Sequence, residues 1–256
     1  MEWLGVLRRQ TAVLWRRILA LGPATPRAVG SSAVSPEGGD KPWLYVLHIG
    51  KTGGTAVKHA LAGCTETRNF RIHLCSHAET LRDVPVGSKV VFFVRDPLTR
   101  FVSGFYSRFR QGRPRYFFPW SEAEERAFRE FATPGELAEA LSSSNADTRE
   151  RAVQAMRGIQ HVSSSYWDWF EDAAYFRQRE ADIFFVGFQE QLNRDFVELR
   201  DRLGLDSAVA LPADEVQAHR NPRNLDYGLS ETARENLKQW YARDYEFLRL
   251  CRAVRR

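Results

Sequence analysis

Cysteine is scarce in this sequence, and no long apolar stretch is free of charged residues. The 256 residues include three cysteines, Cys64, Cys75 and Cys251. An odd and sparse set excludes a disulfide framework and is typical of a reducing compartment. We therefore expect a cytoplasmic protein.

The N-terminal apolar stretch is interrupted by Arg8, Arg9, Arg16 and Arg17. A spanning helix needs about 20 largely apolar residues, and a signal peptide carries its positive charge before the apolar core, so we expect neither. The remaining interpretations are a poorly ordered extension or an amphipathic helix over residues 3–21. Such a helix would lie on a membrane surface or against a partner.

Glycine, proline, serine and alanine dominate the next stretch, Gly22–Pro42. This composition buries little surface and is typical of a linker. The predicted organisation is a basic amphipathic segment with a flexible linker, residues 1–41, followed by one catalytic domain, residues 42–256.

The charge balance is basic, with a net charge of +5 at pH 7 and an isoelectric point of about 9.3. A basic chain favours an anionic partner, which can be a nucleotide, an acidic glycan, a nucleic acid or a membrane surface.

Short apolar runs alternate with helical patterns after the linker. Trp43–Ile49, Lys89–Val94 and Asp182–Phe188 are predicted strands, and Arg68–Leu74 is a weaker candidate. The apolar residues of Lys89–Val94 are continuous, as in strands covered on both faces. The pattern predicts an α/β fold with three layers, in which helices flank a P-loop-like, mainly parallel central sheet.

Several helix ends are marked in the sequence. Pro97 fits the first turn of a helix. A capping box at Thr133–Glu136 begins another in a mostly helical middle region, Ser121–Glu180. A later helix is expected to end at Gly204, and a single last helix to begin near Ser230.

The first predicted strand runs into a glycine-containing turn, GKTGGT, at Gly50–Thr55. Gly53 and Gly54 allow a sharp turn and a close approach of the backbone to a ligand. The N-terminus of the following helix attracts anions. The turn therefore predicts an oxyanion cradle, with a plain strand–helix turn as the alternative. Its side-chain donors are Lys51, Thr52 and Thr55.

The nucleotide P-loop, G-x-x-x-x-G-K-[ST], is the obvious comparison. Gly50–Thr52 supplies GKT, but Tyr45 stands where the earlier glycine belongs. No apolar strand ends convincingly in an aspartate for Mg²⁺, since Asp96 follows an arginine and precedes a proline. The cradle suits a group with less charge than a triphosphate and needs no metal. A small P-loop kinase is the alternative.

A second motif, VRDPLTRFVSGFY, follows the strand Lys89–Val94. Arg95 at the strand end and Ser103 on the next helix suit a second phosphate, because a guanidinium donates two parallel hydrogen bonds. Arg100 and Ser107 share the helix face of Ser103. A structural role is favoured for Arg100.

In this order and at roughly this spacing, the two motifs resemble the sulfotransferase family that includes the carbohydrate sulfotransferases. The heparan-sulfate 2-O-sulfotransferases are one branch of it. KTGGT at Lys51–Thr55 and RDPLTRFVSGF at Arg95–Phe105 match the family pattern. The resemblance covers most of Trp43–Leu250, is weak between residues 111 and 180, and departs at Gly50, where the family often has proline.

The resemblance implies that the domain at residues 42–256 is a sulfotransferase domain. Its donor would be 3′-phosphoadenosine 5′-phosphosulfate (PAPS), used without a metal. The loop would hold the 5′-phosphosulfate, while Arg95 and Ser103 would hold the 3′-phosphate. Lys51 and backbone amides would stabilise charge on the leaving phosphate. The implied donor-binding residues are Lys51, Thr52, Gly53, Gly54, Thr55, Ala56, Arg95 and Ser103.

An acceptor hydroxyl needs a general base, and FRIHLCSHAETL offers His73 and His77. In the family, a histidine falls between the two motifs, and His77 matches it best. His73 is second and Glu79 third, and ordinary packing is the alternative for either histidine. A metal at His73, Cys75 and His77 is not expected, because a structural zinc site needs four ligands.

Arginines and aromatic residues cluster after the second motif, with one acid, Asp96, among them. This strip suits an anionic sugar polymer and also single-stranded nucleic acid. A solvated loop is the alternative. The arginines are Arg95, Arg100, Arg108, Arg110, Arg113 and Arg115.

The sequence thus predicts a sulfotransferase that moves a sulfuryl group in line from PAPS to an acceptor hydroxyl, with a carbohydrate as the favoured acceptor. Lys51 and His77 are the predicted catalytic residues, and no nucleic acid is expected as partner. The alternatives are a small P-loop kinase and a non-catalytic module that binds acidic glycans or membranes.

Overall fold

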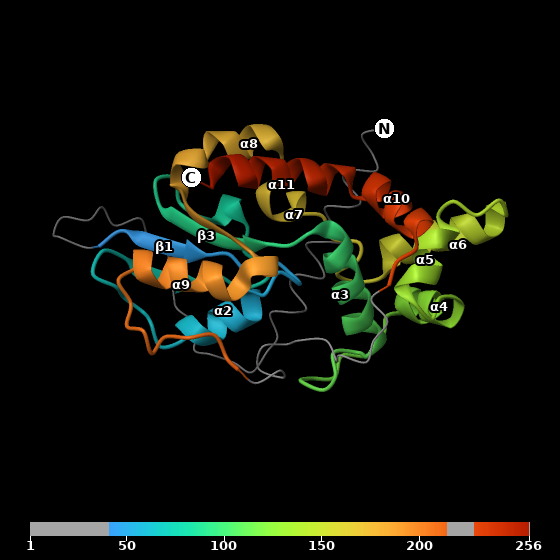
Figure 1. Cartoon of the computed structure of the whole chain (residues 1–256), viewed down its shortest axis with the longest axis horizontal. Helices are drawn as coiled ribbons and strands as arrows, with labels where there is room; N and C mark the ends of the chain where they lie inside the picture. The colour runs from blue at the N-terminus through green and yellow to red at the C-terminus, as the bar shows by residue number, and fades with distance from the viewer. Residues whose placement is uncertain (1–40, 214–227, 256) are drawn as a thin grey trace.

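Four parallel strands form the central sheet of the protein, whose computed structural model describes residues 41–213 and 228–255 (Figure 1). The strand order is β2–β1–β3–β4, and every neighbouring pair is parallel. The predicted N-terminal helix and most of the linker lie outside the described residues. The strands are β1 (Trp43–Val46), β2 (Arg71–Leu74), β3 (Lys89–Val94) and β4 (Ile183–Phe188).

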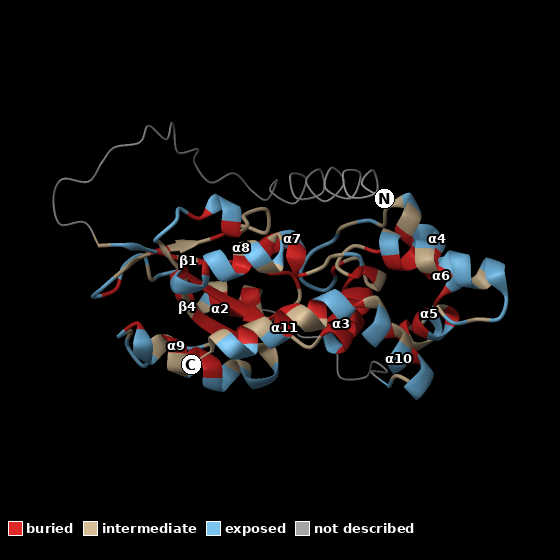
Figure 2. Ribbon diagram, turned by 90° about the horizontal axis from the view of Figure 1, so that it is seen from above, coloured by how far each residue is buried: buried red, intermediate tan, exposed pale blue. Residues whose placement is uncertain are grey.

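Helices cover both faces of this sheet, so the predicted three-layer α/β architecture is confirmed (Figures 1 and 2). On one face lie α2 (Gly54–Leu61) and α9 (Leu192–Arg202). On the other lie α7 (Trp167–Phe170), α8 (Ala173–Gln178) and α11 (Ala242–Val254). Strand β3 sends alternate apolar residues to each face, which explains its unbroken apolar sequence.

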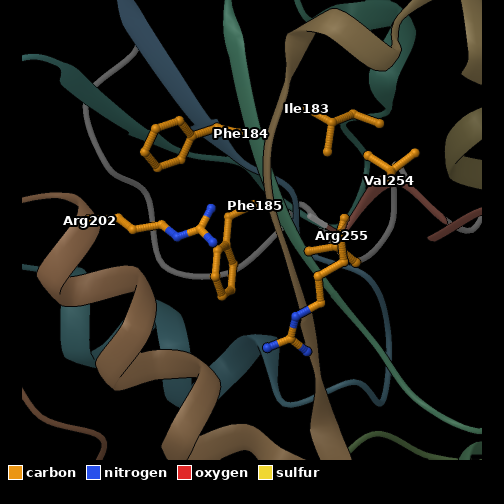
Figure 3. A pocket seen from close by; sticks show the side chains of 7 residues that line it. Ile183, Phe184, Phe185, Arg202, Val254 and Arg255 are labelled. Atoms are coloured by element: carbon orange, nitrogen blue, oxygen red, sulfur yellow. The ribbon is translucent and has the colours of Figure 1, made fainter. Parts of the chain in front are cut away.

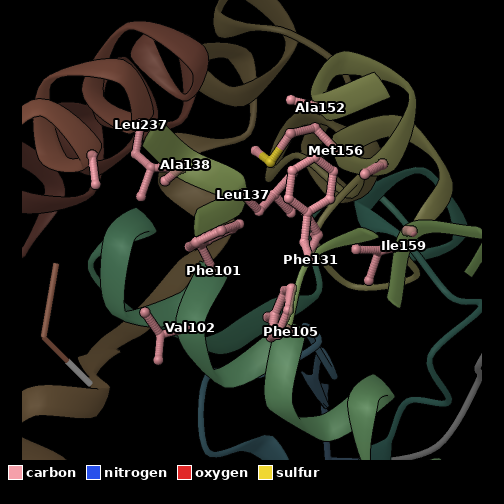
Figure 4. Close-up of a cluster of buried hydrophobic side chains, with 14 of the residues drawn as sticks. Phe101, Val102, Phe105, Phe131, Leu137, Ala138, Ala152, Met156, Ile159 and Leu237 are labelled. Atoms are coloured by element: carbon pink, nitrogen blue, oxygen red, sulfur yellow. The ribbon is translucent and has the colours of Figure 1, made fainter. Parts of the chain in front are cut away.

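Beyond the two hydrophobic clusters on the faces of the sheet, a third joins helices from three parts of the chain (Figure 4). Helix α3 starts directly after β3 and contributes Phe101 and Phe105 to this cluster. The sheet and the helical cluster are therefore connected through α3. The helices are α3 (Pro97–Phe109), α4 (Glu122–Glu130), α5 (Pro134–Ala140), α6 (Ala146–Gly158) and α10 (Glu231–Trp240). Short 3-10 turns are η1 (Leu81–Asp83), η2 (Glu180–Asp182) and η3 (Gln189–Gln191).

The strand order places a topological switch point between β1 and β3. From β1 the chain goes to β2 on one side and then returns to β3 on the other. Ligands of doubly wound sheets bind at such a point, outside the carboxyl ends of the strands. Gly50–Lys51 follows β1 and Arg95 follows β3, so both predicted anion-binding motifs lie there.

Three predicted helix ends are confirmed. Pro97 occupies the first turn of α3, and Thr133 and Glu136 form the capping box of α5. Gly204, with φ 63°, follows the end of α9. The single last helix was wrong, because the chain breaks at Tyr241 into α10 and α11.

Two strands are shorter than predicted. Strand β1 ends at Val46, although Leu47 and Ile49 remain buried. Strand β2 begins at Arg71. Just before it, the Thr67 hydroxyl accepts hydrogen bonds from the amides of Asn69 and Phe70, which closes a turn. Apolar character marked burial correctly but extended the strands too far.

Two arginines lie on either side of Phe185 in strand β4 (Figure 3). The guanidinium groups of Arg202 and Arg255 lie 5.3 and 5.8 Å from the Phe185 ring centroid. They line a narrow pocket beside residues 183–186, and Arg255 also pairs with Asp195. Residues 183–186 form the first part of β4, so this pocket lies away from the carboxyl ends of the strands.

Among the described helices, none has both the length and the apolarity to cross a membrane.

Candidate active site

The turn after β1 has the backbone geometry of an anion-binding loop. Lys51 and Gly53 adopt left-handed conformations, with φ of 68° and 90°. Gly53 is the N-cap of α2 and provides no side-chain cap, so the amides of Gly54 and Thr55 are left for another acceptor, while the Ala56 amide donates to the Gly53 carbonyl at 3.0 Å. The Thr52 hydroxyl points inward and donates to the Ile49 carbonyl at 3.0 Å. The Thr52 hydroxyl is therefore engaged within the loop.

Neighbouring side chains also require the two glycines. A Cβ on Gly54 would lie 2.5 Å from Cδ2 of His48, and one on Gly53 would lie 3.0 Å from Leu192. The imidazole of His48 thus packs directly over the start of α2. At these two positions a side chain would collide with Leu192 or His48, so glycine is needed for packing as well as for any close contact with a ligand.

Lys51 and Arg95 lie beside each other. A long hydrogen bond of 3.5 Å joins Nη1 of Arg95 to the backbone carbonyl of Lys51, and Nε of Arg95 donates to the Thr99 hydroxyl at 2.9 Å. The two motifs therefore meet at one place, as expected from neighbouring parallel strand ends.

The Lys51 ammonium stands among other positive charges. Burial, followed by the charges of Arg95 and Arg110, lowers the pKa of Lys51 to about 7. As a whole residue, Lys51 is half-buried. Burial is the larger cause of the lowered pKa, and the neighbouring cations that add to it suit a polyanionic ligand.

His77 lies against His48, with ring centroids 3.7 Å apart and an interplanar angle of 29°. A hydrogen bond to the backbone of His48 orients the His77 imidazole. Burial, then the charges of Lys58 and Lys51, lower the pKa of His77 to about 4. The ring is therefore neutral at pH 7 and feels the charge of Lys51.

His73 and Glu79, the other candidate bases, are engaged with each other. His73 Nε2 lies 2.7 Å from Glu79 Oε1, and the Ser76 amide donates to Oε2 at 2.5 Å. Burial alone would raise the pKa of Glu79, but these hydrogen bonds outweigh it and lower the value to about 2. Neither group is as well placed as His77 to accept a proton beside Lys51.

His161 is a further imidazole beside Lys51, and the sequence left open whether its segment, His161–Phe170, lines the cleft or belongs to the core. Its φ is 68°, and a Cβ on Gly50 would lie 3.4 Å from its Nδ1. Burial and the charges of Lys51 and His77 lower its pKa well below the ordinary value. No local pattern signals this residue, because the loop after α6 brings it to Lys51 from far along the chain.

The polar residues of α3 share one face, as predicted, but that face is buried. Arg100, Ser103 and Ser107 expose 2%, 6% and 1% of their surface. Nη2 of Arg100 and the Ser107 hydroxyl lack hydrogen-bond partners within the described chain. The place of Ser103 in the site remains a prediction.

The predicted arginine strip is not continuous, which corrects the expectation from sequence. Arg100 and Arg108 are buried, and Arg108 forms a bidentate pair with Glu124 at 2.6 and 2.8 Å. These helical arginines can be buried because other segments supply acceptors, Gly50 and Ser164 for Arg100 and Glu124 for Arg108. The exposed remainder is a loop with Arg113, Arg115, Tyr116 and Phe117.

The residues at the switch point fit a donor with two separate anionic ends, such as PAPS. The adjacent side chains of Lys51 and Arg95, together with the start of α2, which no side chain caps, provide complementary donors. In the described part of the chain, one group of potential metal ligands occurs, His73, Cys75 and Glu79, with donor atoms within 4.8 Å of one another. Two of these three already share a hydrogen bond.

The model of the sulfotransferase family matches residues 40–250. This range contains the central sheet, the helical cluster and both anion-binding motifs. Comparison with curated proteins gives no match. Because the family match spans most of the chain, the protein belongs to the sulfotransferase family.

Proposed function

We propose that the protein transfers a sulfuryl group from PAPS to a hydroxyl of a carbohydrate acceptor. The observation that supports this most strongly is the meeting of Lys51 and Arg95 at the switch point, with the neutral His77 nearby. When bound, PAPS supplies the sulfuryl group, which passes in line to the acceptor oxygen.

The loop Lys51–Ala56 would hold the 5′-phosphosulfate, and Arg95 with Ser103 would hold the 3′-phosphate. In the free protein the pKa of Lys51 is about 7, so this group is only partly protonated at neutral pH. Nearby negative charge would raise that pKa again. The protonated ammonium would then stabilise the charge that develops on the leaving phosphate, without a metal.

His77 would accept the proton of the acceptor hydroxyl. The hydrogen bond to the His48 backbone favours the protonated imidazole, so a backbone carbonyl accepts from one ring nitrogen. The other nitrogen is then an acceptor. With a pKa of about 4 the imidazole is a weak base, and the negative charge of a bound donor would bring that pKa closer to neutrality.

We propose an anionic glycan, of the type used by the heparan-sulfate 2-O branch, as the acceptor. The exposed loop with Arg113 and Arg115 also carries Tyr116 and Phe117, which expose 42% and 57% of their surface. Arginines can pair with carboxylates or sulfates, and exposed rings can stack on sugar faces. No nucleic acid is proposed as a partner.

Direct assay of transfer tests this function. The protein is incubated with PAPS and a panel of glycans, lipids and small alcohols, and products are identified by mass spectrometry. We expect sulfated glycan, together with a larger thermal shift from adenosine 3′,5′-bisphosphate than from ATP–Mg²⁺. Lys51→Ala should lower turnover and donor affinity. A larger shift with ATP–Mg²⁺, or normal activity of Lys51→Ala, would contradict the proposal.

For location, we propose a cytoplasmic protein with peripheral membrane contact through residues 3–21. Co-sedimentation of the full chain with anionic vesicles, compared with a chain that begins at residue 42, tests the contact. Equal sedimentation of both chains would contradict it.

A further inference from the structure

The Tyr166 hydroxyl holds the backbone of Arg95 on both sides. It accepts a hydrogen bond from the Arg95 amide at 2.8 Å and donates one to the Arg95 carbonyl at 2.5 Å. Tyr166 is fully buried, and burial raises the pKa of its phenol, so the hydroxyl keeps its proton. One side chain thus fixes the position of the second anion-binding motif.

Arg100 holds the first motif in a similar way. Its Nε donates to the Gly50 carbonyl at 3.1 Å, and its Nη1 donates to the Ser164 carbonyl at 2.9 Å. Its guanidinium carbon lies 4.6 Å from the centroid of the Tyr166 ring. The groups that hold the two motifs are therefore in direct contact with each other.

Asp244 on α11 contacts both Tyr166 and Arg100. Its Oδ1 accepts the Tyr166 amide at 2.9 Å, and its Oδ2 lies 3.7 Å from Nη1 of Arg100. The Ser165 hydroxyl donates to the same carboxylate at 2.5 Å. Arg100 and Asp244 are both almost completely buried, so water screens their interaction little.

We propose that Tyr166, Arg100 and Asp244 form a positioning unit that sets the separation of the two anion-binding motifs. The inference rests on the proposed function, because a ligand that bridges Gly50–Lys51 and Arg95 requires a fixed spacing. Small misplacements of groups that bind one rigid ligand are costly. These residues act through the backbone of the loops and need no contact with the donor.

Ordinary core packing is the competing explanation, and Tyr241 provides a matched control for it. Tyr241 is buried, and its hydroxyl donates to the Val162 carbonyl at 2.7 Å. Within the described chain its hydroxyl bonds to neither motif, and the variant Tyr241→Phe loses the same chemical group as Tyr166→Phe. A purely structural role would give both variants similar effects.

The test measures the affinity of the full chain for adenosine 3′,5′-bisphosphate by calorimetry, together with the melting temperature. We expect Tyr166→Phe to weaken binding about tenfold, the size of effect that loss of one or two buried hydrogen bonds allows. Tyr241→Phe should lower the melting temperature and leave affinity within about twofold of wild type. In the sulfuryl-transfer assay, Tyr166→Phe should raise the KM for PAPS and leave that for the acceptor unchanged.

Arg100→Lys provides a second variant if Tyr166→Phe folds poorly. It keeps the charge but loses the planar fork that reaches Gly50 and Ser164, and should also weaken bisphosphate binding. Wild-type affinity in Tyr166→Phe, or an equal loss in Tyr241→Phe, would overturn the inference alone. Failure of the wild-type chain to bind bisphosphate would overturn the proposed donor as well.

Discussion

At the scale of single residues, we propose His77 rather than His73 as the general base. His77 stacks on His48 beside the loop, whereas His73 is bound to Glu79. The sequence offered both histidines as the general base but could not decide between them, because their side-chain contacts form only in the folded protein.

We expect His77→Ala to lower kcat by about 100- to 10,000-fold, the usual contribution of a general base. Its affinity for adenosine 3′,5′-bisphosphate should change little. Steady-state kinetics and calorimetry measure the two quantities. His73→Ala is the control and should retain most activity; a greater loss in that variant would assign the base to His73.

Lys51 predicts a pH dependence of donor binding. Its pKa is about 7 in the free protein, and a bound anion raises it. Binding therefore takes up a proton above pH 7, and affinity should fall as pH rises from 7 to 9, by up to about tenfold per unit. In this range the phosphates of the ligand are already ionised.

Calorimetry with adenosine 3′,5′-bisphosphate across this pH range gives the slope directly. Lys51→Arg keeps its charge at every pH used, so it should remove most of the dependence. A flat profile in the wild-type chain would show that Lys51 does not change protonation on binding.

Gly54 links the loop to the histidines. A Cβ at this position would lie 2.5 Å from the His48 ring, so Gly54→Ala should displace His48 and disturb the stacked His77. We expect kcat to fall about tenfold or more. Gly63→Ala is the control, because no atom lies within 4 Å of its added Cβ. Equal activity of the two variants would contradict this role of Gly54.

At the scale of helices and strands, the sequence predicted what depends on local pattern. Strand β3, the Pro97 start of α3 and the capping box at Thr133 follow from apolar runs and helix-end chemistry. The division of the last helix at Tyr241 and the arrival of His161 beside Lys51 depend on tertiary contacts. A single sequence gives no signal for either.

Helix α3 carries a buried ion pair between Arg108 and Glu124, although the sequence predicted Arg108 as part of a basic strip. Arg108 and Glu124 expose 1% and 3% of their side chains. Removing one partner leaves a buried charge, so Arg108→Ala should destabilise the fold by about 3–5 kcal/mol. Urea denaturation measures this change.

Arg129→Ala is the matched control for this ion pair. Arg129 also pairs with a glutamate, Glu125, but exposes 75% of its side chain. Its loss should change stability by less than about 1 kcal/mol. A similar urea midpoint for the Arg108 and Arg129 variants would contradict the structural importance of the buried pair.

At the scale of the whole molecule, the arginines fall into a buried group and an exposed group. Some arginines lie inside and hold segments together, as Arg100 and Arg108 do, while others, such as Arg113 and Arg115, stay at the surface. Composition predicted an anionic partner but could not show which arginines face solvent.

The double variant Arg113→Ala/Arg115→Ala tests the surface arginines. We expect the KM for an anionic glycan to rise several-fold and to become less sensitive to salt, because exposed charges act over about 10 Å in dilute salt. Donor affinity should be unchanged. An unaltered acceptor KM would exclude this loop from acceptor binding.

A crystal structure with bound adenosine 3′,5′-bisphosphate would test the central proposal most directly. We expect one nucleotide to span the carboxyl ends of β1 and β3, with its 5′-phosphate at Lys51 and its 3′-phosphate at Arg95. A nucleotide bound elsewhere, or one that contacts only one of these two residues, would contradict it.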